Sequence, residues 1–448
     1  MSDDQARIRR VARSCLAMAA GTATVAACTV TTSKEYKIPQ AQAAPTPGVA
    51  AREVGEVWTT GLNRDRQLGR APDKLTDAAL APAAGGGGGG RLQAVAVAAG
   101  ARHTLALVSG GRVAAWGAND KGQLGDGTRL DRAVPVAVRA PGNPRLPLTG
   151  VVAIAADTDF SMALLRNGTV VTWGAGTAGQ RGIGRFGRAG EPPSPTLVLR
   201  PDGGGPLTRV RAISADGNTA LALLKDGTVV GWGSNDFGMV GDGSTDDRPL
   251  PRGVRGPDGE ARLAGVTQIA VGGQHGMARL HDGTAVSWGR NDYGQLGDGT
   301  MTDRREPVRV AGPYGLPVLR DIAFITAGEQ HNFALRGDGS VVAWGNNTAG
   351  QLGDGTTAST PRPVQVAGVR SPRLRGVARI VAGEAYGVAV LTDGSVLTWG
   401  SGSRGQLGSG TRAPRTRPGP VVLADGRRTG RVLGVGTGRR HLALLMRW

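Results

Sequence analysis

Seven of the eight tryptophans in the chain recur at a nearly constant spacing. Consecutive members of this set lie 55 to 59 residues apart. A fixed period in this range indicates a repeat architecture in which each copy is one small supersecondary unit. The sequence therefore predicts seven copies of one unit. The repeated residues are Trp58, Trp116, Trp173, Trp232, Trp288, Trp344 and Trp399.

Each copy contains the signals of four short β-strands. Two apolar stretches flank a turn dipeptide such as Asp226-Gly227 or Asp282-Gly283, which supplies the positive φ values that a tight hairpin requires. A further strand precedes the hairpin, as in 266–271, and a proline-led strand follows it, as in 307–310. Helices are disfavoured because the chain has 75 glycines, each costing a helix interior about 0.8–1 kcal/mol relative to alanine. We predict an all-β, seven-bladed β-propeller with four-stranded blades.

The two ends of the repeat region complement each other. Residues 432–445 carry the first two strands of a repeat, and residues 55–69 carry only the second half. Together they make one blade, so the ring is expected to close by pairing of N- and C-terminal strands. The predicted propeller spans residues 52–448, with a closing blade built from 52–84 plus 430–448.

The Trp-Gly pair and the segment Gly-Gln-Leu-Gly-Asp-Gly-Thr, present at 294–300 and 350–356, resemble the regulator of chromosome condensation repeat family. The resemblance covers residues 54–448 and implies a seven-bladed propeller. It also implies two activities of family-like proteins: guanine-nucleotide exchange on a small GTPase in eukaryotes, and β-lactamase inhibition by some secreted bacterial propellers. The chain departs from the pattern at Gln180–Gly184, at Met239–Gly241 and at Trp58, which is followed by Thr instead of Gly.

The amino terminus is similar to a bacterial export signal. A basic stretch ending at Arg13 precedes an uncharged run from Ser14 to Val25, too short to span a membrane as a helix. The following Val-Ala-Ala-Cys resembles a lipobox, in which Cys28 would be lipidated. We predict an export signal at 1–28, a flexible Ala/Thr/Pro tether at 29–51, and a cell-membrane lipoprotein.

Other interpretations of this segment stay open. Cleavage after Ala43 would give a soluble secreted protein, and a cytosolic protein with an Ala-rich tail is a further alternative. Arg9-Arg10 is also compatible with a twin-arginine signal, so the export route stays undecided. Both cysteines, Cys15 and Cys28, lie before the propeller, which excludes disulfides and thiol catalysis in the predicted propeller.

Repeated polar residues are interpreted as architecture. His103, His275, His331 and His441 share one slot, which holds Phe160, Asn218 or Tyr386 in other copies. Because equivalent positions diverge into separate blades, hydrogen bonding within the blade is expected, with no metal site. Asp126, Asp242, Asp298 and Asp354 lie in Gly-Asp-Gly loops that lack the acidic ladder of a calcium loop, so turn and capping roles are expected. No catalytic constellation and no cofactor motif is visible.

The net charge is +18, and the loops after the tryptophan strands are rich in arginine. These loops predict a basic rim on one face, which favours an anionic partner. A solvated surface with an arginine bias from a GC-rich genome is the alternative. The predicted binding residues are Arg64, Arg66, Arg70, Arg181, Arg185, Arg188, Arg412, Arg415 and Arg417.

We therefore expect a monomeric, non-enzymatic propeller at the bacterial cell envelope that binds a protein or an anionic polymer through its basic face. A nucleic-acid partner is not expected, and the only membrane association expected is the lipid anchor. One alternative is a regulator of a small GTPase that resembles a guanine-nucleotide exchange factor. Another is an envelope enzyme whose site is built from irregular loops.

Overall fold

The computed structural model describes residues 53–70, 76–85, 90–188, 191, 193–426 and 429–448. The predicted export signal and tether, with Cys28, lie outside the described residues. Within the described part of the chain, no helix has the length and apolar character needed to cross a membrane.

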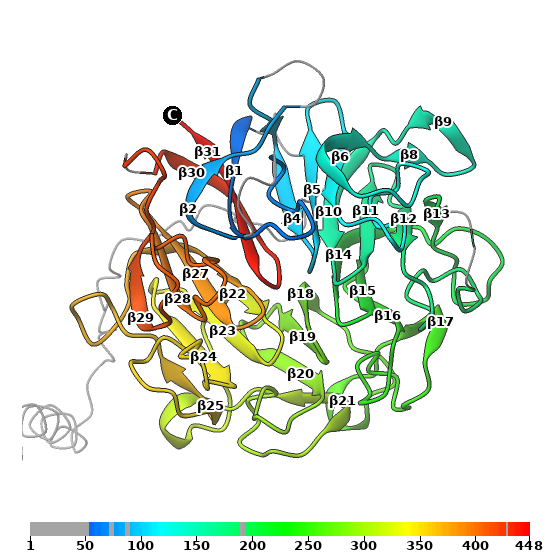
Figure 1. Cartoon of the computed structure of the whole chain (residues 1–448). Helices are drawn as coiled ribbons and strands as arrows, with labels where there is room; N and C mark the ends of the chain where they lie inside the picture. Colours follow the sequence, from blue (N-terminus) through cyan, green and yellow to red (C-terminus); the bar gives the residue numbers. More distant parts are fainter. Residues whose placement is uncertain (1–52, 71–75, 86–89, 189–190, 192, 427–428) are drawn as a thin grey trace, which may run out of the picture. The chain divides into compact units, whose positions relative to one another are not determined.

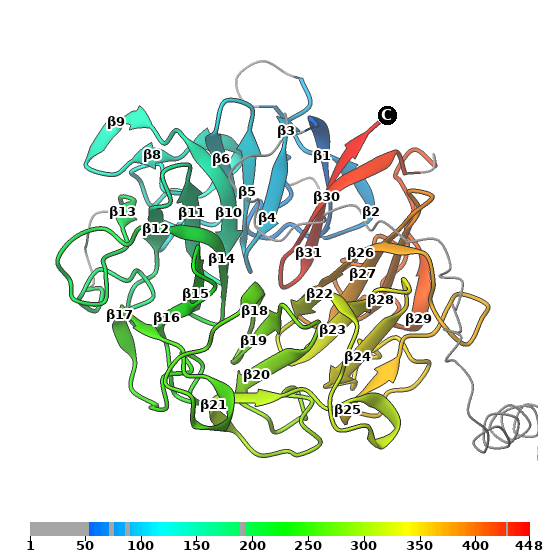
Figure 2. The same ribbon diagram turned by 180° about the vertical axis from the view of Figure 1, so that it is seen from behind.

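The described strands form eight antiparallel sheets, of which seven are the blades arranged around a common centre (Figure 1; Figure 2 from behind). Six blades are contiguous in sequence, and in each the strands pair in chain order. Blade 1 contains β4 (Ala96–Ala99), β5 (His103–Val108), β6 (Arg112–Gly117) and β7 (Arg132–Ala137); blade 2 contains β10 (Val151–Ala156), β11 (Phe160–Leu165), β12 (Val170–Gly174) and β13 (Thr196–Leu197); blade 3 contains β14 (Val210–Asp216), β15 (Thr219–Leu224), β16 (Val229–Gly233) and β17 (Arg248–Gly253).

The next three blades repeat the pattern. Blade 4 contains β18 (Val266–Gly272), β19 (His275–Leu280), β20 (Ala285–Gly289) and β21 (Arg304–Arg309); blade 5 contains β22 (Ile322–Ala327), β23 (His331–Arg336), β24 (Val341–Gly345) and β25 (Thr360–Gln365); blade 6 contains β26 (Val377–Ala382), β27 (Tyr386–Leu391), β28 (Val396–Gly400) and β29 (Arg415–Pro420). Connections between blades hold the short pair β8 (Arg139–Ala140) and β9 (Asn143–Pro147) and the 3-10 turns η1 (Pro257–Gly259) and η2 (Pro313–Gly315).

The closing blade joins the two ends of the propeller. Its strand order is β2 (Thr76–Pro82), β1 (Gly55–Leu62), β31 (His441–Arg447) and β30 (Arg431–Thr437), with β3 (Gln93–Ala94) also paired to β1. Strands β1 and β31 are antiparallel, with Glu56 opposite Met446 and Gly61 opposite His441. Figure 1 shows dark-blue β1 beside red β31. The predicted all-β, seven-bladed propeller with noncovalent closure is confirmed.

Adjacent blades share their hydrophobic cores. Leu221 and Leu223 of blade 3, for example, pack in one buried cluster with Ile269 and Trp288 of blade 4. All seven repeated tryptophans are buried. In blades 1 to 6 each indole N–H donates to a loop carbonyl of the preceding blade, as Trp344 does to Gln295 over 3.1 Å. The repeated tryptophans therefore pack and hydrogen-bond between blades.

The histidine slot also connects blades, and two details of our expectation are wrong. His103 Nε2 bonds to Ser161 Oγ of blade 2 at 2.8 Å, so the hydrogen bond joins two blades, whereas we expected it within one blade. The blade 3 occupant is Thr219, because Thr219 lies opposite Gly233 as His103 lies opposite Gly117. Asn218 is one residue earlier, in the turn.

The antiparallel strands give the propeller two faces. We call loop face the end that carries the turns between the first and second strands (100–102 in blade 1) and the long loops after the tryptophan strands (118–131 in blade 1). We call connector face the opposite end, with the hairpins between the second and third strands (109–111) and the connections between blades (138–150). The first strands line a central cavity of about 260 Å³, whose walls include Ile213, Ile269 and Ile325.

Candidate functional site

The nine predicted arginines all belong to the loop face or to the outer strand that follows its long loops. They fall on three blades. The closing blade carries Arg64, Arg66 and Arg70, and the neighbouring blade 6 carries the three around 412–417. Blade 1 separates this sector from the three arginines of blade 2, so the nine do not form one patch.

Two of the predicted arginines bind within their own blade. The Arg70 guanidinium donates to Thr59 Oγ1 (2.7 Å) and pairs with Asp77 (2.7 Å). Arg181 is buried and pairs with Glu191 at 2.7 Å, and burial lowers its pKa. Both side chains therefore stabilise the conformation of the long loop to which they belong.

The other seven predicted arginines are less buried. Arg185 is exposed and pairs with Glu191, the same carboxylate that binds Arg181. Arg415 is half-buried and donates to the Pro420 carbonyl at 2.9 Å. The remaining five side chains are exposed, and their role in binding stays a prediction: Arg64, Arg66, Arg188, Arg412 and Arg417.

Sequence reasoning missed a second set of charges on the loop face. They lie at the turns between the first and second strands, around the mouth of the central cavity, and we call them the inner charged ring. Each lies one to three residues before the slot that holds histidine in four blades. The sequence did contain a signal for them. The histidine slot and the Trp-Gly pair are repeated in the copies, whereas the residues just before the slot differ in charge from copy to copy. We restrict the ring to the residues that pair with one another, which leaves out Arg440: Arg102, Asp157, Asp159, Asp216, Glu329, Glu384 and Arg439.

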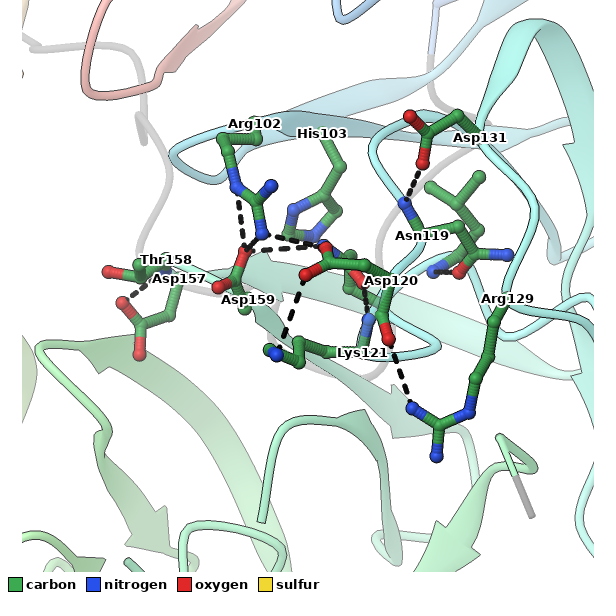
Figure 3. A network of polar contacts seen from close by, with 12 residues as sticks. Arg102, His103, Asn119, Asp120, Lys121, Arg129, Asp131, Asp157, Thr158 and Asp159 are labelled. Carbon is green, nitrogen blue, oxygen red and sulfur yellow. Dashed lines mark hydrogen bonds and ion pairs between the residues drawn. The ribbon is translucent and has the colours of Figure 1, made fainter. Parts of the chain in front are cut away.

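Arg102 links blades 1 and 2 at this ring (Figure 3). Its Nη2 donates to Asp120 Oδ1 (2.7 Å) and to Asp159 Oδ1 (2.9 Å). Gln123 Nε2 also donates to both carboxylates. Burial alone would raise the pKa of Asp120, but the hydrogen bonds from Gln123 and Arg102 hold it below its usual value. The network fixes two carboxylates and one guanidinium in place.

Asp157, which is buried, and Asp216, which is half-buried, form a carboxyl pair between blades 2 and 3. Asp157 is 2% exposed and accepts the backbone N–H groups of Gly217 (3.0 Å) and Asn218 (2.8 Å). Burial raises the pKa of both groups, and for Asp216 the charge of Asp157 raises it further. One proton is therefore retained by this pair well above the usual pH range of aspartate.

Arg439 plays the corresponding role on the other side of the mouth. Its Nη2 binds Glu329 Oε1 of blade 5 (2.6 Å) and its Nε binds Glu384 Oε1 of blade 6 (3.2 Å). Burial and the charge of Glu329 raise the pKa of Glu384, against the opposing charge of Arg439. Three blades thus meet at one guanidinium.

An asparagine amide binds the aspartate of each Gly-Asp-Gly loop in blades 1, 3, 4 and 5. In blade 1, Asn119 Nδ2 donates to Asp126 Oδ1 (3.0 Å), to the Thr128 carbonyl (3.0 Å) and to the Leu130 carbonyl (3.2 Å). Asp126 also caps the turn by accepting the Thr128 N–H at 2.9 Å, as expected. No cluster of three or more metal-ligating side chains occurs among residues 53–448 where the structure describes them.

These features define a closed propeller whose blades interlock through buried tryptophans and whose loop face carries a fixed ring of opposite charges. Family models match in three places: the RCC1-like domain over residues 16–370, and two regulator of chromosome condensation (RCC1) repeat models over 393–445 and 377–406. The chain belongs to the regulator of chromosome condensation repeat family.

Relatives place this repeat region in different proteins. The chain is 31% identical to the ultraviolet-B receptor UVR8 of Arabidopsis thaliana over 367 residues, 81% of this chain and 76% of that protein. It is 33% identical to the human E3 ubiquitin-protein ligase HERC2 over 298 residues, 66% of this chain. The chain spans only 6% of the length of HERC2.

Solved structures share the fold. Human WBSCR16 superposes with a TM-score of 0.72 at 22% identity, covering 88% of this chain and 100% of that chain. Yeast RCC1 (Prp20), in complex with Kap60, superposes with a TM-score of 0.66 at 22% identity, covering 89% and 90%. At this identity the likeness shows the architecture alone.

Proposed function

We propose that the protein is a non-enzymatic binding module that holds a protein partner on its loop face, with the inner charged ring at the centre of the contact. The observation that carries this proposal is the fixed arrangement of both charge signs around the cavity mouth. Arg102 and Arg439 are each held by two carboxylates, and the Asp157–Asp216 pair lies between them in chain order.

A protein surface suits this ring better than a polyanion does. A uniform polyanion would be attracted to the two guanidinium groups and repelled by the carboxylates between them. A folded partner can place opposite charges against both, and such complementarity gives specificity and speeds association. The ring is preorganised by contacts across blades, which lowers the entropy cost of binding.

Photo-crosslinking on intact cells tests this contact. A photoreactive amino acid replaces Arg440, which is exposed on the loop face beside the ring, and a control chain carries it at Arg112, an exposed residue of a connector-face hairpin. We expect a discrete protein adduct at position 440 and none at 112. An adduct only at 112, or none at either position, would overturn the proposal.

We also propose that the protein acts at the cell envelope, on the basis of the export-like segment and Cys28. The test is fractionation of a Cys28→Ala variant after a high-salt wash, because salt screens charge contacts with the membrane surface. We expect the variant to leave the membrane fraction while the parent stays. Retention of both through the wash would contradict lipid anchoring.

Guanine-nucleotide exchange on a small GTPase is a second candidate, favoured by the likeness to yeast Prp20p. That protein is described together with its binding to Gsp1p and histones. The assay is release of a fluorescent guanine nucleotide from small GTPases of the source organism. Acceleration by the purified chain supports exchange. Cleavage of the chain by protease added to intact cells rules it out, because the GTPase would be cytosolic.

A further inference from the structure

Two connections on the connector face, opposite the proposed protein site, contain arginines and no acidic residue. The connection 366–376 between blades 5 and 6 contains Arg370, Arg373 and Arg375 and no acidic residue, and the connection 138–150 contains two arginines and no acidic residue. On the loop face, by contrast, each long loop of blades 1, 3, 4 and 5 carries its own aspartates.

The arginines of the two faces also differ in their partners. On the loop-face side, Arg132, Arg248 and Arg304 each pair with the aspartate of their own Gly-Asp-Gly loop, at 2.9, 2.7 and 3.1 Å. Arg370, Arg373 and Arg375 are exposed, and their guanidinium groups form no hydrogen bond or ion pair within the described part of the chain. The charge of Arg375 also acts on the Asp338 carboxylate of the blade 5 hairpin, and the charges of Arg370 and Arg373 are available to an external anion.

Exposed apolar and aromatic side chains lie on the same face. Tyr314, in η2 at the tip of the connection between blades 4 and 5, is 87% exposed, and its backbone has a φ of 56°, unusual for a residue other than glycine. Leu316 follows it at 56%, Val369 precedes Arg370 at 48%, and Trp448 ends the chain at 48%. Tyrosine and tryptophan favour the membrane–water interface, where the ring is buried and its polar atom is hydrated.

The described chain begins on this face. Glu53 pairs with Arg431 at 2.9 Å and with Arg447 at 3.7 Å, both at connector-face ends of their strands. The preceding residues are therefore joined to the propeller here. If Cys28 is lipidated, as proposed above, the anchor lies 25 positions before Glu53 in the sequence, on the part of the chain that enters the propeller at this face.

We propose that the connector face is a membrane-contacting surface that binds anionic phospholipid headgroups. Arg370, Arg373 and Arg375 bind the lipid phosphates, because guanidinium groups donate two parallel hydrogen bonds to phosphate oxygens. Tyr314 and Leu316 enter the interfacial layer. The loop face then points away from the membrane, toward its partner. The charge and apolar observations carry this proposal without the lipid anchor.

Vesicle co-sedimentation tests the surface, using the full chain with Cys28→Ser so that no lipid anchor contributes. The parent is mixed with vesicles of phosphatidylglycerol plus phosphatidylcholine and with vesicles of phosphatidylcholine alone. We expect binding to the anionic vesicles only, weakened by salt. The variant R370E/R373E/R375E should bind them on the order of 100-fold more weakly, from the usual contribution of a basic residue at an anionic surface.

The matched control is R305E/R362E/R404E, which makes the same charge change at exposed residues of the long loops on the loop face and of the outer strands that follow them. We expect it to bind like the parent, and both variants to keep the parent's melting temperature. Equal weakening by the two variants, or equal binding to both vesicle types, would overturn the proposal. Binding of short duplex DNA through the same three arginines, without binding to vesicles, would also overturn the proposal, because the face would then bind a polyanion and not a membrane. None of these results bears on the crosslink at position 440.

Discussion

Trp173 of blade 2 donates its indole N–H to the backbone carbonyl of Gln123 in blade 1, over 2.9 Å. The hydroxyl of Ser161 donates to the same carbonyl at 2.9 Å, and Ser161 Oγ also bonds to His103 of blade 1. One buried carbonyl thus receives two donors from the next blade. The Trp-Gly pair and the Gly-Gln-Leu-Gly loop recur together because each repeat supplies the acceptor for its successor.

The glycine that follows this acceptor should not tolerate a side chain. Gly125 has φ +63°, and a Cβ there would lie 2.8 Å from Trp173 Cδ1. Gly127 in the same loop has φ +82° but open space around it. We expect Gly125→Ala to lower the free energy of unfolding by about 2–4 kcal/mol, from backbone strain plus overpacking, and Gly127→Ala by about 1 kcal/mol. Denaturant unfolding measures both. Equal losses would show that backbone strain alone sets the cost.

The fold was predictable because its determinants repeat. Trp288 and the Asp282-Gly283 turn identify the strands and the hairpin of one blade from local sequence alone. A repeat period of this length is compatible with few architectures. The partner of a slot residue was not predictable, because His103 bonds to Ser161 of the next blade and adjacency of blades is a property of the closed ring.

The candidate site was harder to predict for a related reason. Its residues differ from copy to copy, as Arg102 and Asp159 do, so a search for repeated features passes over them. The predicted arginines lie in the long loops after the tryptophan strands or on the outer strands that follow them. Burial and pairing, as at Arg181 with Glu191, depend on loop conformation that composition does not reveal. The charge of the connector face became visible only when the connections were assigned to one end of the strands.

The histidine slot predicts acid sensitivity. Burial lowers the pKa of His331 to about 3 and that of His441 to about 4. Each is neutral when folded but binds a proton when unfolded below about pH 6.5, so the free energy of unfolding falls as pH decreases from 6.5 toward those values. We expect a loss on the order of 2 kcal/mol per histidine between pH 7.5 and 5.

Two substitutions by phenylalanine, the natural occupant in blade 2, check this sensitivity. The residue of blade 6 equivalent to Ser161 is Gly387, which has no side chain, so the ring nitrogens of His331 have no side-chain partner among the described residues. His331→Phe should keep the melting temperature at pH 7.5 and reduce its fall at pH 5. His441 bonds to Thr104 Oγ1 at 2.9 Å, so His441→Phe should cost about 1 kcal/mol at pH 7.5. If the melting temperatures of both variants depended on pH as the parent's does, the buried histidines would not be the cause of the acid sensitivity.

The amide at the centre of the blade 1 loop should not be replaceable by a carboxylate. Asn119→Asp removes the donor to Asp126 and places two carboxylates within contact distance, so we expect a loss of about 2–4 kcal/mol in unfolding free energy. Asn167→Asp is the matched control, because Asp226 occupies the equivalent turn position in blade 3, and should stay within about 0.5 kcal/mol. Thermal unfolding with and without EDTA completes the test: chelation should leave the parent unchanged, and a large shift would indicate a bound cation.

Replacing Asp216 by asparagine should stabilise the protein at high pH. Burial and the charge of Asp157 raise the pKa of Asp216, so folding takes up a proton above the usual aspartate pKa of about 3.9. The stability that the protonated pair provides is complete below that pH and is lost as pH rises through the folded-state pKa, at up to about 1.4 kcal/mol per pH unit. Asp216→Asn cannot titrate, and its amide can still donate to Asp157.

The melting temperature of Asp216→Asn should match that of the parent near pH 4 and exceed it increasingly toward pH 8. The control is Asp236→Asn, at an exposed loop position of the same blade, whose melting temperature should follow that of the parent throughout. A constant offset across the pH range would mean that the pair does not share a proton.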